Sequence, residues 1–119
     1  MVTLFGIPNC DTVKKAQNWL TAQGISHTLH NYKKEGVTAA HLKLWSSQVP
    51  WQQLLNKQSS TFKGLTEAEQ AKAHTKAGAL KLMEAYPTLI KRPVAVVQDK
   101  VLAVGFKAEL WQTLAWLGA

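Results

Sequence analysis

The spacing of hydrophobic residues divides the chain into two strand-containing parts with a helical part between them. Residues 2–5 form a short β-branched and aromatic run that ends at Gly6, so they predict a strand. Hydrophobic residues then recur with helical spacing over residues 13–24, and Gly24 is suited to end that helix. Residues 25–32 alternate in part and predict a second strand, parallel to the first because a helix connects the two.

The middle of the chain has the pattern of several short helices. We predict them at about residues 38–47, 50–55, 67–73 and 76–86, with polar loops at 33–36 and 56–61. The aromatic and methionine positions of these helices are typical of core residues.

The last third returns to sheet. Residues 93–97 predict an apolar strand, residues 98–100 a turn, and residues 101–104 an antiparallel return strand. A final helix is expected over about residues 107–117. The order β-α-β, helical block, β-β-α predicts one α/β domain over residues 1–119, with a mixed sheet and a helical insertion at about 38–86.

The most informative residue is the only cysteine, because it follows the first strand at the start of the first helix. Free backbone N–H groups and the positive end of the helix dipole favour a thiolate at Cys10, and Lys14 and Lys15 add positive charge. We interpret Cys10 as a nucleophile. The alternative is that Cys10 is a small buried hydrophobic residue, since no histidine base lies near it in the sequence.

Positive charge exceeds negative charge along most of the chain. Lysine and arginine number 14 against 7 acidic residues, a formal net charge of +7, which attracts anions. The lysines are spread in ones and twos, so a solvated surface explains them better than a nucleic-acid patch. The only arginine, Arg92, precedes Pro93 and offers a bidentate fork for oxyanions, although it could instead form a surface ion pair with Glu84, Asp99 or Glu109.

Other features limit where the protein acts. One cysteine permits no internal disulfide, the N-terminus has no secretory pattern, and no apolar run is long enough to span a membrane. We therefore expect a cytoplasmic protein that is a monomer. His27 and His30 face opposite sides of a strand, so we expect no metal site.

Four separated motifs resemble one family. They are Gly-Ile-Pro-Asn-Cys-Asp-Thr-Val-Lys-Lys-Ala at 6–16, Leu-Leu-Asn-Lys at 54–57, Lys-Arg-Pro-Val at 91–94 and Val-Gly-Phe-Lys at 104–107. Their order resembles the arsenate reductase ArsC/Spx family, in particular its YffB-like branch, over essentially the whole chain. The resemblance implies a thioredoxin-like fold.

The resemblance also implies roles for individual residues. Cys10 matches the nucleophilic cysteine, Arg92 matches an arginine that holds the oxyanion, and Pro93 matches the cis proline of the fold. The residues around the cysteine are further candidates for binding the substrate or anion: Asn9, Asp11, Thr12 and Lys14. Asn56, Lys57 and Lys107 fall near positions where arsenate reductases carry additional arginines.

Two departures from the family pattern qualify the function. One arginine cannot form the three-arginine clamp of glutathione-linked arsenate reductases. Spx-type regulators switch through a Cys-X-X-Cys pair, whereas Val13 occupies the second position here. The leading hypothesis is a one-cysteine thiol oxidoreductase with no bound cofactor, in which the Cys10 thiolate attacks an oxyanion or a disulfide and an external thiol releases the adduct. Glutathione is the expected thiol, with glutaredoxin as a further partner. The alternative is a non-enzymatic regulator that binds the C-terminal domain of the RNA polymerase alpha subunit.

Overall fold

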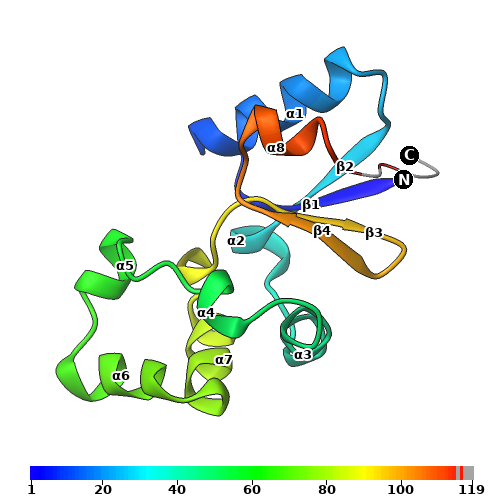
Figure 1. The fold of residues 1–119 in the computed structure, drawn as a ribbon. Coiled ribbons are helices and arrows are strands. Elements are labelled where there is room, and N and C mark those ends of the chain that lie inside the picture. The colour runs from blue at the N-terminus through cyan, green and yellow to red at the C-terminus, as the bar shows by residue number, and fades with distance from the viewer. Residues whose placement is uncertain (115, 117–119) are drawn as a thin grey trace. The chain divides into compact units, whose positions relative to one another are not determined.

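The protein folds into two compact units, described here from a computed structural model that places residues 1–114 and 116 (Figure 1). The sheet unit comprises residues 1–32 together with the chain from Arg92 onward, and the helical unit comprises Lys33–Lys91. The chain therefore leaves the sheet unit after its second strand and returns to it at Arg92. The helical unit includes the predicted insertion and extends beyond it at both ends.

The sheet unit contains four strands in the order β2-β1-β3-β4. Their bounds are β1 Val2–Gly6, β2 His27–Asn31, β3 Val94–Val97 and β4 Lys100–Val104. Strand β1 is parallel to β2 and antiparallel to β3, and β3 and β4 form an antiparallel hairpin. The predicted turn is confirmed, with Gln98 and Asp99 both at positive φ, as a tight two-residue hairpin requires.

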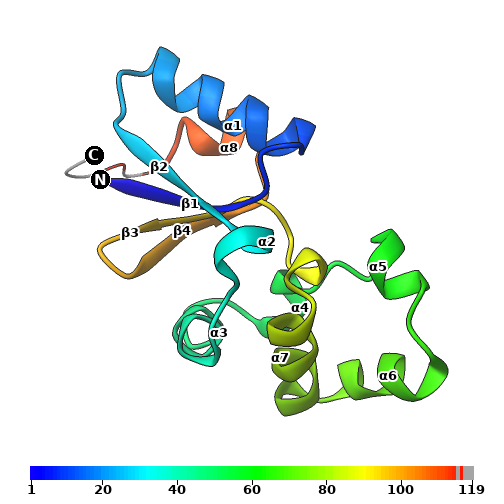
Figure 2. The ribbon, with the colours of Figure 1, turned by 180° about the vertical axis from the view of Figure 1, so that it is seen from behind.

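Helices α1 (Asp11–Ala22) and α8 (Ala108–Trp111) lie side by side on one face of this sheet (Figures 1 and 2). Their inner residues pack on alternate residues of the strands, which point to the same face. The resulting core consists of Val2, Leu4, Ala16, Leu20, Ala95, Val97, Ala103 and Trp111. Trp19 of α1 meets Trp111 of α8 edge to face, with ring centroids 5.7 Å apart.

The prediction of a helix over about 107–117 is too long. Helix α8 ends at Trp111, and the end of the predicted span falls partly on residues outside the described part. Side chains occupy the carbonyl groups that a longer helix would need: Thr113 Oγ1 donates to the Leu110 carbonyl at 2.7 Å, and the Trp116 indole donates to the Trp111 carbonyl at 2.9 Å.

The helical unit is built from short helices joined by caps and turns. Their bounds are α2 Tyr32–Glu35 (which begins on the last residue of the sheet unit), α3 Ala39–Ser46, α4 Trp51–Leu54, α5 Ser60–Lys63, α6 Glu67–Ala71, α7 Lys76–Ala85, and two 3-10 turns at Lys72–His74 and Pro87–Leu89. Thr38 and Thr66 each accept from the backbone three residues later, which begins α3 and α6 as predicted. Helix α7 packs against α3 and the first 3-10 turn.

Two stretches predicted as loops are in fact helical turns. Helix α2 covers most of residues 33–36, and α5 begins inside the predicted loop at 56–61. Both helices are four residues long, so a sequence period cannot reveal them. At α5 the local cause is the Ser59 hydroxyl, which accepts from the Phe62 N–H at 3.2 Å.

Candidate functional site

The site is built at one end of the sheet, where β1 and β2 finish and β3 begins. We call this the Gly6 end, because Gly6 pairs with Asn31 of β2 and the neighbouring Phe5 pairs with Val94 of β3. The segment from Ile7 to Asn9 leaves this end and leads directly into α1. The β-α connection therefore delivers Cys10 to the Gly6 end, as the sequence pattern predicts.

Cys10 is the N-cap residue of α1. Its backbone is extended (φ −107°, ψ 123°), and its carbonyl accepts the first helical hydrogen bond from the Lys14 N–H at 2.9 Å. The thiol makes no capping hydrogen bond to the described residues, and Cys10 is half-buried rather than enclosed in the core. A sulfur at this position faces the positive end of a twelve-residue helix and remains accessible to a reaction partner.

The neighbours of Cys10 differ in exposure. Asn9, Asp11 and Lys14 are exposed, and Thr12 is half-buried. Asp11 lies in the first turn of α1, where a carboxylate is favoured by the helix dipole. These predicted residues thus lie with Cys10 in one local segment, and their role in binding a substrate stays a prediction.

Arg92 and Pro93 approach the same end of the sheet from the opposite direction. The Arg92–Pro93 peptide bond is cis, as the resemblance implied, and Pro93 is buried just before β3. Arg92 is half-buried and forms no ion pair with the described residues of the sheet unit, so the alternative of a pair with Asp99 or Glu109 is not observed. Its guanidinium keeps its hydrogen-bonding capacity for a ligand.

Lys107 is the third predicted cation of the sheet unit. The Gly105 N–H donates to the Pro93 carbonyl at 2.8 Å, which ties the end of β4 to the cis proline. Lys107 follows two residues later as the exposed N-cap of α8. It is therefore carried to the Gly6 end as well.

Asn56 and Lys57 belong to the helical unit, where they line a hollow of about 340 Å³. The other residues around it are Trp51, Gln52, Leu55, Gln58 and Lys91. The Asn56 side-chain oxygen already accepts from the Gln58 N–H at 3.0 Å. The structure groups Asn56 and Lys57 with each other, and their approach to Cys10 stays a prediction.

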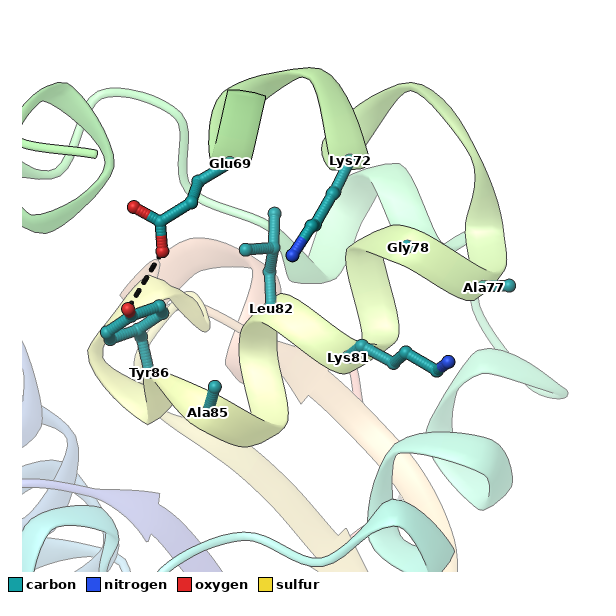
Figure 3. A pocket seen from close by; sticks show the side chains of 8 residues that line it. All are labelled: Glu69, Lys72, Ala77, Gly78, Lys81, Leu82, Ala85 and Tyr86. Carbon is teal, nitrogen blue, oxygen red and sulfur yellow. Dashed lines mark hydrogen bonds between the residues drawn. The ribbon is translucent and has the colours of Figure 1, made fainter. Parts of the chain in front are cut away.

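A second hollow of the helical unit, about 480 Å³, is lined by residues of α6, the first 3-10 turn and α7 (Figure 3). The Tyr86 hydroxyl donates to Glu69 Oε2 at 2.9 Å across it. This bond lowers the pKa of the Glu69 carboxyl and raises the pKa of the Tyr86 phenol. The two polar groups satisfy each other, so the pair holds α6 against α7.

The sequence analysis missed Tyr32, which follows β2 at the Gly6 end. Its side chain is 1% exposed, and its hydroxyl has no hydrogen-bond partner among the residues that the structure describes. Burial raises the pKa of this phenol, and the positive charge of Arg92 opposes that rise in part. No sequence signal singles out this tyrosine, because its interest lies in a buried hydroxyl without a partner among the described residues. Over the same described residues, no group of three metal-ligating side chains forms.

Comparison with known proteins identifies the class to which this geometry belongs. The ArsC family model matches residues 5–114. An uncharacterized protein of Haemophilus influenzae is 40% identical over 94% of this chain and 96% of its own. The global transcriptional regulator Spx of Staphylococcus epidermidis is 28% identical over 92% of this chain and 82% of its own.

Solved structures give the same result. A structure titled YFFB protein matches with a TM-score of 0.87 and 38% identity, over 94% of this chain and 96% of the other. An arsenate reductase (ArsC) related protein from Brucella melitensis matches with a TM-score of 0.74 and 45% identity, over 93% and 91% of the two chains. The fold is thioredoxin-like, with a cysteine at the start of the first helix. The chain belongs to the ArsC family.

Proposed function

We propose that this protein is a single-cysteine thiol oxidoreductase that uses glutathione as its reducing co-substrate. The observation that carries this proposal is the placement of Cys10 as the half-buried N-cap of α1, at the sheet end where β3 begins two residues after Arg92. The Cys10 thiol makes no capping hydrogen bond to the described residues. The helix end favours a thiolate, and the guanidinium favours an anionic group on the partner. The net charge of +7 further favours glutathione, which is anionic.

The chemistry needs two external thiols because the chain contains one cysteine. The Cys10 thiolate attacks one sulfur of a disulfide, a new S–S bond forms, and the other half leaves as a thiolate. A glutathione thiolate then attacks the substrate-derived sulfur of the mixed disulfide, and Cys10 leaves as a thiolate. A second glutathione thiolate cleaves the resulting glutathione–substrate disulfide, which gives oxidised glutathione and the second substrate thiolate. The substrate gains two electrons and two protons, and the two thiols that supplied them become one disulfide.

An oxyanion such as arsenate is the other substrate class that the family relationship brings into consideration. Arg92 is the only arginine, and lysines provide point charges without a bidentate fork. We therefore expect small disulfides to be turned over faster than arsenate.

A reductase assay with glutathione and glutaredoxin tests the proposal. Wild type is compared with Cys10→Ser on arsenate and on small disulfides. We expect disulfide turnover by wild type and none above background by the variant. Equal rates for the two proteins would refute a catalytic role for Cys10.

The similarity to Spx supports a second candidate, a regulator that binds the C-terminal domain of the RNA polymerase alpha subunit. The disulfide switch cannot operate, because Val13 stands three residues after Cys10 and is fully buried. Retention of the alpha subunit on immobilised protein, unchanged by Cys10→Ser, would favour this function. Absence of binding would exclude it.

A further inference from the structure

Tyr32 carries a buried hydroxyl that the mechanism above does not use. The side chain is 1% exposed, yet the hydroxyl forms no hydrogen bond to any described residue. A buried hydroxyl without a partner destabilises the folded chain, and most such groups in native proteins have a partner. Tyr32 is therefore a candidate for contact with a ligand.

The strand register places this residue beside the site. Gly6 pairs with Asn31 on one side of β1, and Phe5 pairs with Val94 on the other. Tyr32 directly follows Asn31, and Arg92 stands two residues before Val94, so both residues begin at the Gly6 end, on opposite sides of β1. Neighbouring strands are about 4.8 Å apart, so β2 and β3 lie about 10 Å apart across β1, a span that two long side chains can cover.

Charge links the two side chains directly. Burial raises the pKa of the Tyr32 phenol above its usual value, and the positive charge of Arg92 opposes that rise in part. The phenol consequently remains protonated at neutral pH and can donate a hydrogen bond. A neutral O–H donor beside a guanidinium matches an oxygen-bearing anion, because such an anion accepts from both groups.

We propose that Tyr32 donates a hydrogen bond to an oxygen of the anionic group that Arg92 binds, so that the preferred substrates of Cys10 carry an oxyanion or a carboxylate. This inference rests on the proposed function, in which Cys10 is the nucleophile. It adds Tyr32 as a binding residue and restricts the substrate class. A neutral disulfide has no anionic oxygen to accept hydrogen bonds from the Tyr32 hydroxyl and the Arg92 guanidinium.

Alkylation of Cys10 separates recognition of an anion from reactivity of the sulfur. Iodoacetate and iodoacetamide react in the same way: an S–C bond forms, the C–I bond breaks and iodide leaves, but only iodoacetate carries a carboxylate. We expect Tyr32→Phe to lower the iodoacetate rate about tenfold, the usual effect of losing a hydrogen bond to a charged group. The iodoacetamide rate should not change.

The matched control is Tyr86→Phe, which removes a hydroxyl bonded to Glu69 in the helical unit. It should leave both alkylation rates unchanged. An unchanged iodoacetate rate in Tyr32→Phe would overturn the inference and leave the proposed function intact. Failure of wild-type Cys10 to react with either reagent would overturn both.

A ligand titration of the wild-type chain does not require Tyr32→Phe to fold. The chain has two tyrosines, so ¹³C labelling at Cζ gives two signals, which Tyr86→Phe assigns. Titration with S-methylglutathione and, separately, with inorganic phosphate should shift the Tyr32 signal. Greater potency of S-methylglutathione would identify the bound group as a carboxylate, and greater potency of phosphate would identify it as an inorganic oxyanion. No shift with either would overturn the inference.

Discussion

Cys10 occupies a position where most helices place a side-chain acceptor. Serine, threonine, aspartate and asparagine commonly bond the N–H groups of the first helical turn, whereas the Cys10 sulfur makes no such bond to the described residues. The backbone still forms the cap, through the Cys10 carbonyl and the Lys14 N–H. The helix end can therefore stabilise negative charge on the sulfur, or on an adduct formed there.

Arg92→Lys tests the need for a planar fork at the site. The lysine keeps the positive charge but loses bidentate geometry, so we expect the rate with oxidised glutathione to fall about tenfold. Unfolding free energy should change by only about 0.5 kcal/mol, as for other substitutions outside the core. Stopped-flow kinetics and urea unfolding measure the two effects.

Lys100→Met is the matched control for the loss of one charge. Lys100 is exposed and pairs with Val97, at the end of the sheet opposite to Gly6. The reaction of Lys100→Met with oxidised glutathione should be about as fast as that of wild type. The rate of Arg92→Met should fall at least as far as the rate of Arg92→Lys. If Lys100→Met and Arg92→Met slow the reaction equally, Arg92 contributes only to the overall charge.

At the scale of elements, Gly6 sets how closely α1 packs on β1. A Cβ added at Gly6 would lie 2.8 Å from Val13 Cγ2, and Val13 is fully buried. Gly6→Ala should therefore cost about 1–3 kcal/mol of unfolding free energy through overpacking. Thermal or urea unfolding measures this cost.

A double-mutant cycle identifies the cause. In the Val13→Ala background, Gly6→Ala should be less costly because the contacting methyl group is gone. Gly64→Ala serves as control, since its Cβ would meet no atom closer than 3.4 Å. An equal cost of Gly6→Ala in both backgrounds would exclude steric contact with Val13.

The capping box of α6 predicts a pH dependence. Hydrogen bonds from Tyr86 and Thr66 lower the pKa of the Glu69 carboxyl below its unfolded value of about 4.3. The stabilisation is therefore present above that value and is lost as the pH falls through the lower folded-state pKa. Wild type should exceed Glu69→Gln in stability at pH 7, and this difference should shrink as the pH falls below the unfolded value in urea unfolding. A difference that does not vary with pH would contradict this assignment.

The strands and helix α1 could be predicted because each spans at least two of its own hydrophobic periods. The strand at residues 2–5, the helix that follows Cys10 and the hairpin around Gln98 all appear where the pattern places them. The four-residue helices α2 and α5 are shorter than any reliable period, and the early end of α8 depends on side-chain bonds from Thr113 and Trp116. Tertiary contacts and local hydrogen bonds, rather than a sequence period, determine where these three helices begin and end.

At the scale of the whole molecule, the net charge of +7 should affect association with anionic substrates. Raising the salt concentration from about 10 mM to about 150 mM shortens the screening length from about 30 Å to about 8 Å. The rate with oxidised glutathione should fall several-fold. The rate with the neutral bis(2-hydroxyethyl) disulfide should change much less, and equal salt effects on both would contradict electrostatic steering.

The site could be predicted only in part, because it depends on how distant segments meet. The β-α turn locates Cys10 from local sequence, but the position of Arg92 follows from the antiparallel register of β3. Tyr32 was missed because its significance lies in an unsatisfied buried hydroxyl, which no sequence pattern records. No helix among the described residues is long and apolar enough to cross a membrane.

The central claim is that Cys10 is a nucleophile toward an anionic disulfide. Incubation with oxidised glutathione at neutral pH, followed by intact-mass and peptide mass spectrometry, tests it most directly. We predict one glutathione per chain, attached at Cys10 and formed faster than on the same chain unfolded in urea. An unmodified Cys10, or equal rates for folded and unfolded chains, would contradict the account.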